Sequence, residues 1–229
     1  MGNFHPFSLY LVVVTLLVAF HSGDRLVSGH GRMMEPPNRS SIWRRVEYEE
    51  LHPPINYNDN ELFCGGFIIQ YEHNDGKCGE CGDSFNSTKP RENEHGGFYG
   101  KGIITKTYTR GQEIVILVEL TFGHMGYFEF RVCNLDNDQS ESEACFEQNL
   151  LQLSNGSPTI PTRYPIPTSG VGWYNIKASL PTNLVCFHCV LQWHYYAGNS
   201  WGECEDGTYA IGCGPQETFR GCADIAIIN

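Results

Sequence analysis

The sequence predicts an all-β domain, a sandwich of strands joined by long loops and held by several disulfides. Three observations predict it. Two neighbouring runs have strand patterns, the connecting segments are rich in Gly, Pro and Asn, and no long segment shows the 3.6-residue period of an amphipathic helix. The chain also contains ten cysteines, all between residues 64 and 222. Such a combination is typical of a β-sandwich with one core.

The two clearest strands are expected at residues 113–121 and 126–133. The first run, EIVILVELT, is rich in β-branched residues and long enough for a buried strand. In the second, GYFEFRVC, Phe128 and Phe130 point one way while Glu129 points the other.

Three further strands and one short helix complete the expected elements. The strands are expected at residues 172–180, 186–195 and 224–228, and the helix near 140–151. We find no internal repeat and no second hydrophobic unit, so residues 30–229 are interpreted as one domain.

The first 29 residues are interpreted as a signal peptide. Residues 7–20 form an apolar run that is too short for the roughly 20 residues that span a bilayer. Cleavage after Gly29 would make His30 the first residue of the mature chain, and cleavage after Gly23 is the alternative. We therefore expect a secreted, extracellular protein that has no membrane segment after processing.

The cysteines agree with that compartment. All ten lie beyond residue 29, and an even number in an exported domain predicts up to five disulfides, whose connectivity the sequence does not reveal. Two Cys-x-x-Cys pairs, Cys78/Cys81 and Cys186/Cys189, could hold zinc, but disulfides are favoured in an oxidising compartment. Asn38, Asn86 and Asn155 begin glycosylation patterns.

The net charge indicates which partners are excluded. The only charged residues of the leader are Asp24 and Arg25. The mature chain therefore keeps 14 of 15 basic and 25 of 26 acidic residues, and its net charge stays at −11. Such a surface repels nucleic acid and anionic membranes, whereas a neutral polysaccharide would not be repelled.

His30 differs from the other histidines because cleavage before it would create a second nitrogen donor. The free α-amino group titrates near about 8 and can lose its proton to a metal at neutral pH. With its own ring nitrogen and one more imidazole it would form a planar set of three nitrogens, which suits Cu(II). His124, at the turn between the two clearest strands, is the best-placed partner. His188 and His194 would lie about 20 Å apart on one strand and cannot chelate one ion.

Several motifs in order extend this hypothesis. They are His30-Gly-Arg-Met-Met-Glu-Pro-Pro-Asn, Asn60-Glu-Leu-Phe-Cys-Gly-Gly, Cys78-Gly-Glu-Cys-Gly-Asp, Gly123-His-Met-Gly-Tyr-Phe, Gln192-Trp-His-Tyr, Gly198-Asn-Ser-Trp and Gly212-Cys-Gly-Pro-Gln-Glu-Thr-Phe. From residue 30 to the end, the chain resembles the lytic polysaccharide monooxygenases of auxiliary-activity family 15, found in arthropods and other invertebrates. In that family the mature protein starts at the histidine.

The resemblance implies an immunoglobulin- or fibronectin-like β-sandwich and a copper histidine brace. His30 would give its amine and ring nitrogen, and His124 its ring nitrogen. Phe219 would occupy the axial aromatic position, where some relatives have tyrosine. Gln192 would lie near the oxygen-binding face, and a buried polar residue of the core is the alternative. Phe122 departs from the family, which usually has alanine two positions before the second histidine.

The implied activity is oxidative cleavage of glycosidic bonds in insoluble polysaccharide, chitin or cellulose. O2 or H2O2 would be the co-substrate, and a small molecule or protein would supply electrons to copper. We expect a monomer. A non-catalytic chitin-binding or copper-binding protein that keeps the fold is the alternative, to which Phe122 gives weight. A disulfide-rich structural matrix protein is a third hypothesis and predicts no tight copper binding.

Overall fold

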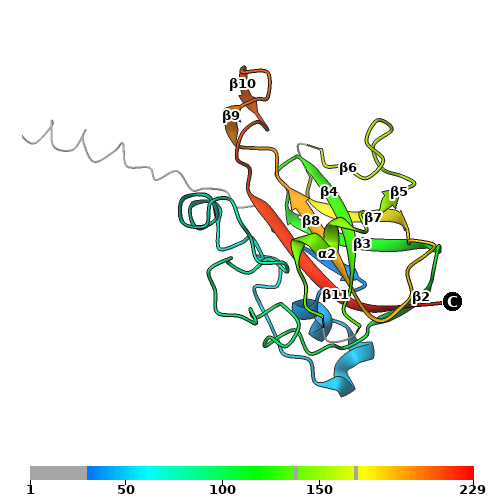
Figure 1. Ribbon diagram of the computed structural model, residues 1–229. Coiled ribbons are helices and arrows are strands. Elements are labelled where there is room, and N and C mark those ends of the chain that lie inside the picture. Colours follow the sequence, from blue (N-terminus) through cyan, green and yellow to red (C-terminus); the bar gives the residue numbers. More distant parts are fainter. Residues whose placement is uncertain (1–29, 137–138, 168–169) are drawn as a thin grey trace, which may run out of the picture.

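The computed structural model describes residues 30–136, 139–167 and 170–229, and two β-sheets are its main elements of secondary structure (Figure 1). The predicted leader lies outside these residues. One buried cluster draws its apolar side chains from both sheets. The prediction of an all-β sandwich with long loops is therefore confirmed.

The strand order of each sheet is as follows. The first sheet has the order β1-β3-β7-β5, formed by β1 (His30–Glu35), β3 (Glu113–Phe122), β7 (Gly172–Ser179) and β5 (Gln152–Leu153). The second has the order β2-β11-β8-β4-β6, formed by β2 (Lys106–Thr109), β11 (Thr218–Ile228), β8 (Cys186–Tyr196), β4 (Tyr127–Asn134) and β6 (Tyr164–Pro165). A separate hairpin consists of β9 (Trp201–Glu203) and β10 (Tyr209–Ile211).

The two clearest predicted strands are β3 and β4. In β3 every second residue from Ile114 to Leu120 points into the core, so this strand is buried on one face only. In β4 the predicted alternation is confirmed, with Phe128 and Phe130 fully buried in the core. Its other face is also covered, because loops and a short helix pack over Glu129 and its neighbours.

The remaining elements were predicted in part. The expected helix is α2 (Glu143–Glu147), whose N-cap is Ser142. Strand β11 begins six residues earlier than predicted, and the strands that were not predicted are β1, β2, β5, β6, β9 and β10. Three short helical turns lie in the long segment between β1 and β2. They are η1 (Arg39–Arg44), η2 (Val46–Leu51) and η3 (Ile69–His73). None of the helices in the described part of the chain has the length and apolar character needed to cross a bilayer.

All ten cysteines are paired, as expected for an oxidising compartment. The disulfides are Cys64–Cys78, Cys81–Cys222, Cys133–Cys145, Cys186–Cys189 and Cys204–Cys213. Disulfide formation thus replaces the zinc alternative at both Cys-x-x-Cys pairs. The bond that closes the longest loop, with a sequence separation of 141, ties the region around residue 81 to β11.

A buried ion cluster holds the segment after β1 to the second sheet. Arg39, with 1% of its surface exposed, donates two hydrogen bonds to Asp224 at 2.8 and 2.5 Å and one to Glu141 at 2.5 Å. The ring of His188 contacts the same carboxylate, with Nε2 2.7 Å from Oδ1. Because both charged partners of Arg39 are themselves buried, the cluster fixes η1 against β11.

Asn38, one of the three glycosylation patterns, lies inside this part of the fold. Only 1% of it is exposed, and a Cβ atom added to Gly221 would lie 2.3 Å from its side-chain oxygen. The fold leaves no space for a glycan at Asn38.

The ion cluster predicts how stability depends on pH. Burial alone would raise the pKa of the Asp224 carboxyl, but Arg39, with His188, lowers this pKa from 3.8 to about 2. A carboxyl whose pKa is lowered in the folded protein stabilises the fold at pH values above its pKa in the unfolded chain. This contribution is lost as the pH falls towards 2. We expect a loss of about 2 kcal/mol of unfolding free energy between pH 5 and pH 2 that Asp224→Asn does not show, measured by urea denaturation.

At pH 7 the same variant should be less stable by about 3–5 kcal/mol, because Arg39 would be left buried without its carboxylate. Asp75→Asn, which changes an exposed aspartate with a φ of 52° that asparagine also adopts, is the matched control and should behave like the wild type. Equal pH dependence in the wild type and Asp224→Asn would contradict this account.

Candidate metal centre

The pairing of β1 with β3 brings His30 to the loop that carries His124. His30 lies opposite Phe122, the last residue of β3 and two residues before His124. The Thr121 hydroxyl donates to the His30 carbonyl at 3.3 Å. Gly31 permits this close approach, because a Cβ atom there would lie 2.4 Å from a Leu120 methyl carbon. The strand can therefore dock only with a glycine after His30.

The main chain around His124 is fixed by the end of β8. Tyr195 accepts a hydrogen bond from the His124 N–H at 2.8 Å and donates one to the Met125 carbonyl at 2.8 Å. The His124 carbonyl accepts from the Gly198 N–H at 2.8 Å. Gly126 has a φ of 86°, and a Cβ atom there would lie 1.9 Å from the Tyr196 carbonyl oxygen. The turn therefore needs glycine at this position, and it holds the imidazole in one place.

The ring of His124 is oriented by polar partners at one nitrogen. Nδ1 lies 2.8 Å from the Asn199 side-chain nitrogen and 3.8 Å from a carboxylate oxygen of Glu217. Burial lowers the pKa of His124, the charge of His30 lowers it further, and the Asn199 hydrogen bond opposes the shift. A neutral imidazole is the form that binds a metal, so this environment favours the ligating form of His124.

His30 is partly exposed and is also oriented through one nitrogen. Its Nε2 lies 3.3 Å from a carboxylate oxygen of Glu61, and 26% of its side chain is exposed. This contact leaves Nδ1, the ring nitrogen nearer its own main-chain nitrogen, available to a metal. Outer partners of this kind fix the orientation of ligating histidines in metalloproteins.

The donor set fits copper if the amine of His30 is free. Among the side chains of residues 30–136, 139–167 and 170–229, no three His, Cys, Asp or Glu residues are arranged to hold a metal ion. Two imidazoles therefore need a main-chain nitrogen as the third donor. An amine with Nδ1 of His30, together with Nε2 of His124, makes an all-nitrogen set that suits Cu(II). With a metal on Nε2, the ring proton would lie on Nδ1, where the side-chain oxygen of Asn199 would accept it once the amide is flipped, and the carboxylate of Glu217 at 3.8 Å would add a favourable charge.

One phenylalanine contacts the His124 ring, and another packs on a residue that binds the His124 main chain. Phe122 packs edge-on against the His124 ring, with centroids 5.4 Å apart, and 43% of it is exposed. Phe219 is fully buried, and its ring stacks on Tyr195 at 5.6 Å and lies 6.2 Å from Phe63. Phe219 thus supports the residue whose hydroxyl holds the His124 turn, and its predicted axial role stays a prediction.

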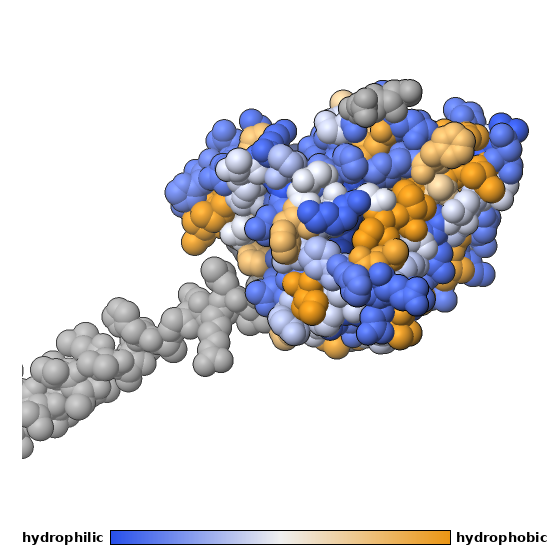
Figure 2. Space-filling model, turned by 90° about the horizontal axis from the view of Figure 1, so that it is seen from below, coloured by the Kyte–Doolittle hydropathy of each residue, from blue (hydrophilic) through white to orange (hydrophobic). Residues whose placement is uncertain are grey.

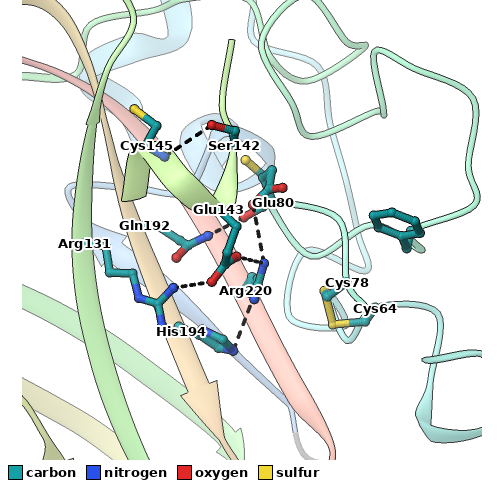
Figure 3. A network of polar contacts seen from close by, with 12 residues as sticks. Cys64, Cys78, Glu80, Arg131, Ser142, Glu143, Cys145, Gln192, His194 and Arg220 are labelled. Carbon is teal, nitrogen blue, oxygen red and sulfur yellow. Dashed lines mark hydrogen bonds and ion pairs between the residues drawn. A yellow bond between two sulfur atoms is a disulfide. The ribbon is translucent and has the colours of Figure 1, made fainter. Parts of the chain in front are cut away.

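Gln192 lies elsewhere on β8, in a buried polar network (Figure 3). It is three residues from Tyr195 and so faces the opposite side of the strand. Its side-chain nitrogen donates to the Glu80 carbonyl at 2.7 Å, and its network includes Arg131 and Arg220. This placement favours the alternative of a buried core polar residue, and a role near the oxygen-binding face stays a prediction.

Sequence reasoning assigned no role to four residues that surround the histidines. They are Glu61, Tyr195, Asn199 and Glu217. Glu61, Tyr195 and Asn199 stand in motifs that were matched, yet nothing in one sequence says which side chain of a motif points at a histidine. The signal for Glu217 was its spacing, two residues before Phe219 and hence on the same side of an extended chain.

Comparison with known proteins places this geometry in context. A family model described as lytic polysaccharide mono-oxygenase, cellulose-degrading, matches residues 30–225. The chain shares 46% sequence identity with an auxiliary-activity family 15 lytic polysaccharide monooxygenase from Thermobia domestica, whose structure is of the Cu(I) state. The two structures match with a TM-score of 0.80, over 87% of this chain and 99% of that chain. No curated protein sequence matches the chain.

Two other solved structures are less similar. A chitin binding domain from Burkholderia pseudomallei is 16% identical, with a TM-score of 0.45, over 87% of this chain and 100% of that chain. A cellulose-active lytic polysaccharide monooxygenase in complex with copper is 12% identical, with a TM-score of 0.40, over 86% of this chain and 98% of that chain.

The contacts of Nδ1 predict that Asn199 and Glu217 contribute to metal affinity. In protein whose first residue is His30, we expect Asn199→Ala and Glu217→Ala each to weaken Cu(II) binding by about 10–100-fold, because the His124 ring loses an orienting partner. Calorimetric titration measures this. Asn86→Ala removes an exposed asparagine and serves as the control. Unchanged affinity in both site variants would refute the assignment.

Proposed function

Because the chain belongs to the lytic polysaccharide monooxygenase family and is of the auxiliary-activity 15 type, we propose that His30 and His124 hold its copper ion. The protein is accordingly a copper-dependent monooxygenase that cleaves polysaccharide oxidatively. The single observation that supports our assignment of the site is the register of β1 on β3, which sets His30 beside Phe122 and close to His124. A non-catalytic binding protein is not favoured.

In this proposal the protein mainly positions groups around copper. Bound copper supplies one-electron redox chemistry, with electrons from an external donor and O2 or H2O2 as co-substrate. Glu61 orients the His30 ring, while Asn199 and Glu217 orient the ring of His124. Phe122, with its ring exposed beside His124, borders the side from which a polymer surface approaches.

The axial aromatic residue of the site is proposed to be Phe219. The stacking of Phe219 on Tyr195, which binds the main chain of the His124 turn, supports this assignment. Phenylalanine has no oxygen, so on this side copper would face a hydrocarbon ring. A tyrosine here would instead present a hydroxyl that can donate a hydrogen bond.

Residues 1–29 are proposed to be a signal peptide whose removal creates the amine of His30. Only cleavage after Gly29 gives this donor, because cleavage after Gly23 would leave the nitrogen of His30 in a peptide bond. Secretion is supported by the five disulfides. We propose an extracellular monomer that acts on insoluble chitin, cellulose or both.

Each ligand should be needed for activity. In correctly processed, copper-loaded protein, His30→Ala and His124→Ala should each lower the release of oxidised oligosaccharides by more than about 100-fold, a larger effect than loss of an outer partner. Mass spectrometry of products from chitin and from cellulose measures this and identifies the substrate.

Two controls sharpen this experiment. His52→Ala removes an exposed histidine and should leave product release unchanged. Wild-type protein that keeps Gly29 in front of His30 should lose tight copper binding, because its amine is an amide. Oxidised products from both ligand variants at the wild-type rate would refute the proposed site.

Glycosylation is proposed at Asn86 rather than at Asn38. Asn86 is exposed, whereas Asn38 is buried, and both Asn155 side-chain atoms bond the main chain of β7, to Asn175 and Lys177, each at 2.8 Å. We expect secreted protein from eukaryotic cells to lose the mass of one glycan on treatment with a glycosidase specific for N-linked glycans. Asn86→Gln should abolish that shift and Asn38→Gln should not; a glycan found on Asn38 would contradict the assignment.

A further inference from the structure

Two histidines outside the proposed copper site, His95 and His188, lie with their rings in contact. The ring centroids are 4.8 Å apart, and the ring planes meet at 74°. We call these two residues the histidine pair. His188 is near the start of β8 and seven residues before Tyr195, which corresponds to about 23 Å of extended strand. The pair is therefore well separated from Tyr195 and from the His124 turn that Tyr195 holds.

The ring of His188 is held by a carboxylate at one nitrogen and is free at the other. Its Nε2 lies 2.7 Å from Oδ1 of the fully buried Asp224. Because a carboxylate only accepts hydrogen bonds, Nε2 of the neutral ring carries the proton and Nδ1 has the lone pair. Nδ1 has no hydrogen-bond partner within the described residues, and 22% of the side chain is exposed. A histidine held in this way commonly binds a metal through its other nitrogen, because the carboxylate fixes the ring and increases its basicity.

The loop that carries His95 is fixed by a tight turn and by a buried carboxylate. The main-chain N–H of His95 donates to Glu141 at 3.0 Å. A Cβ atom added to Gly100 would lie 1.9 Å from the Glu94 carbonyl oxygen, so the turn requires glycine at that position. The ring of His95 makes no hydrogen bond in the part of the chain that the structure describes, and the residue is exposed. A free imidazole is therefore presented beside His188.

The two rings turn edges that carry nitrogen towards one point. A Cβ atom added to Gly102 would lie 3.6 Å from Cε1 of each ring, and Cε1 is the carbon bonded to both ring nitrogens. Because Gly102 has no side chain, it does not fill this point. Two imidazoles on one zinc ion, with Zn–N bonds of about 2.0–2.1 Å and a tetrahedral angle between them, have ring centroids about 5 Å apart. The observed separation of 4.8 Å is close to that value.

The charges around the histidine pair favour a cation. Asp224 binds one ring, and Asp136 and Glu141 accept from the main-chain N–H groups of the two histidines. Arg39 pairs with two of these three carboxylates. The whole protein has a net charge of −11, and Figure 2 shows hydrophilic residues around separate apolar patches on the face drawn. A negative surface raises the local concentration of cations.

We propose that the histidine pair is a second metal site, which binds a divalent ion such as Zn2+ or Cu2+ through Nδ1 of His188 and a ring nitrogen of His95. Both ions take imidazole ligands, whereas Ca2+ and Mg2+ take oxygen. In the described parts of the chain no three His, Cys, Asp or Glu side chains are arranged around one ion, so water would complete its coordination. With two protein ligands instead of the four of a structural zinc site, the ion stays exchangeable. It would join the His95 loop to β8.

Calorimetric titration with zinc chloride tests the proposal in protein that carries His30→Ala and His124→Ala. These two changes remove the proposed copper ligands, so only other sites can bind the ion. One zinc ion should bind, and a further His95→Ala should weaken its binding by more than about tenfold, since a ligand matters more than the outer partners of a ligand. His73→Ala, which removes another exposed histidine, is the matched control and should leave the affinity unchanged.

Thermal denaturation of the same variants gives a second readout. An ion that binds only the folded chain stabilises it, so zinc at 100 times its Kd should raise the melting temperature by about 5–10 °C. With His95→Ala this shift should disappear. His95 is the residue to change because it is exposed, whereas His188 also binds the buried Asp224.

Several results would overturn the second site. They are the absence of zinc binding before His95 is changed, equal zinc affinity with and without His95→Ala, and an equal loss of affinity with His73→Ala. Binding of Ca2+ as tight as that of Zn2+ would also overturn it, because oxygen ligands would then hold the ion. Copper(II) chloride in place of zinc chloride should bind more tightly, as the affinity order of imidazole sites requires. Because neither proposed copper ligand is present, these outcomes do not depend on the proposed function.

Discussion

In the antiparallel register between β1 and β3, His30 lies opposite Phe122, and the pairing of the two candidate ligands depends on this register. A shift of one residue would turn His30 to the other face of the sheet. The register is held by local devices, among them Gly31, which admits the Leu120 side chain, and Thr121, which donates to the His30 carbonyl. The position of His30 relative to His124 therefore depends on how β1 pairs with the end of β3.

The loops between η1 and β2 are stabilised by cross-links and buried charge rather than by strand pairing. Cys64–Cys78 closes this region on itself, and Cys81–Cys222 ties it to β11. Arg91, which is 1% exposed, donates to the Phe85 carbonyl and pairs with Glu94 inside the loops. Since Glu61 extends from this same region to His30, the loops also help to define the site.

Much of the sandwich could be predicted because the pattern of β3 and β4 is local: alternation and β-branched residues decide it within ten positions. The short strand β1 lacks that pattern, since Arg32 and Glu35 stand among its few apolar residues and its pairing comes from tertiary contacts. At the site, the two histidines followed from donor chemistry and from resemblance. The partners of their rings did not, because Asn199 and Glu217 reach His124 only when β8 and β11 lie side by side. Gln192, also on β8, donates to the Glu80 carbonyl in a buried network, a contact that strand pattern alone could not predict.

The unequal burial of the two histidines bears on how the enzyme matures. His124, 5% exposed, is set by the folded core through Tyr195, whereas His30 lies at the edge of the fold with 26% of its side chain exposed. Neither proposed ligand belongs to the buried apolar cluster or to a disulfide, in contrast to zinc fingers, whose fold depends on their metal ligands. On the proposed processing, His30 and His124 offer three nitrogens to a redox-active ion only after a peptidase has cut between Gly29 and His30. A single peptide bond therefore separates an inert precursor from the redox-active protein.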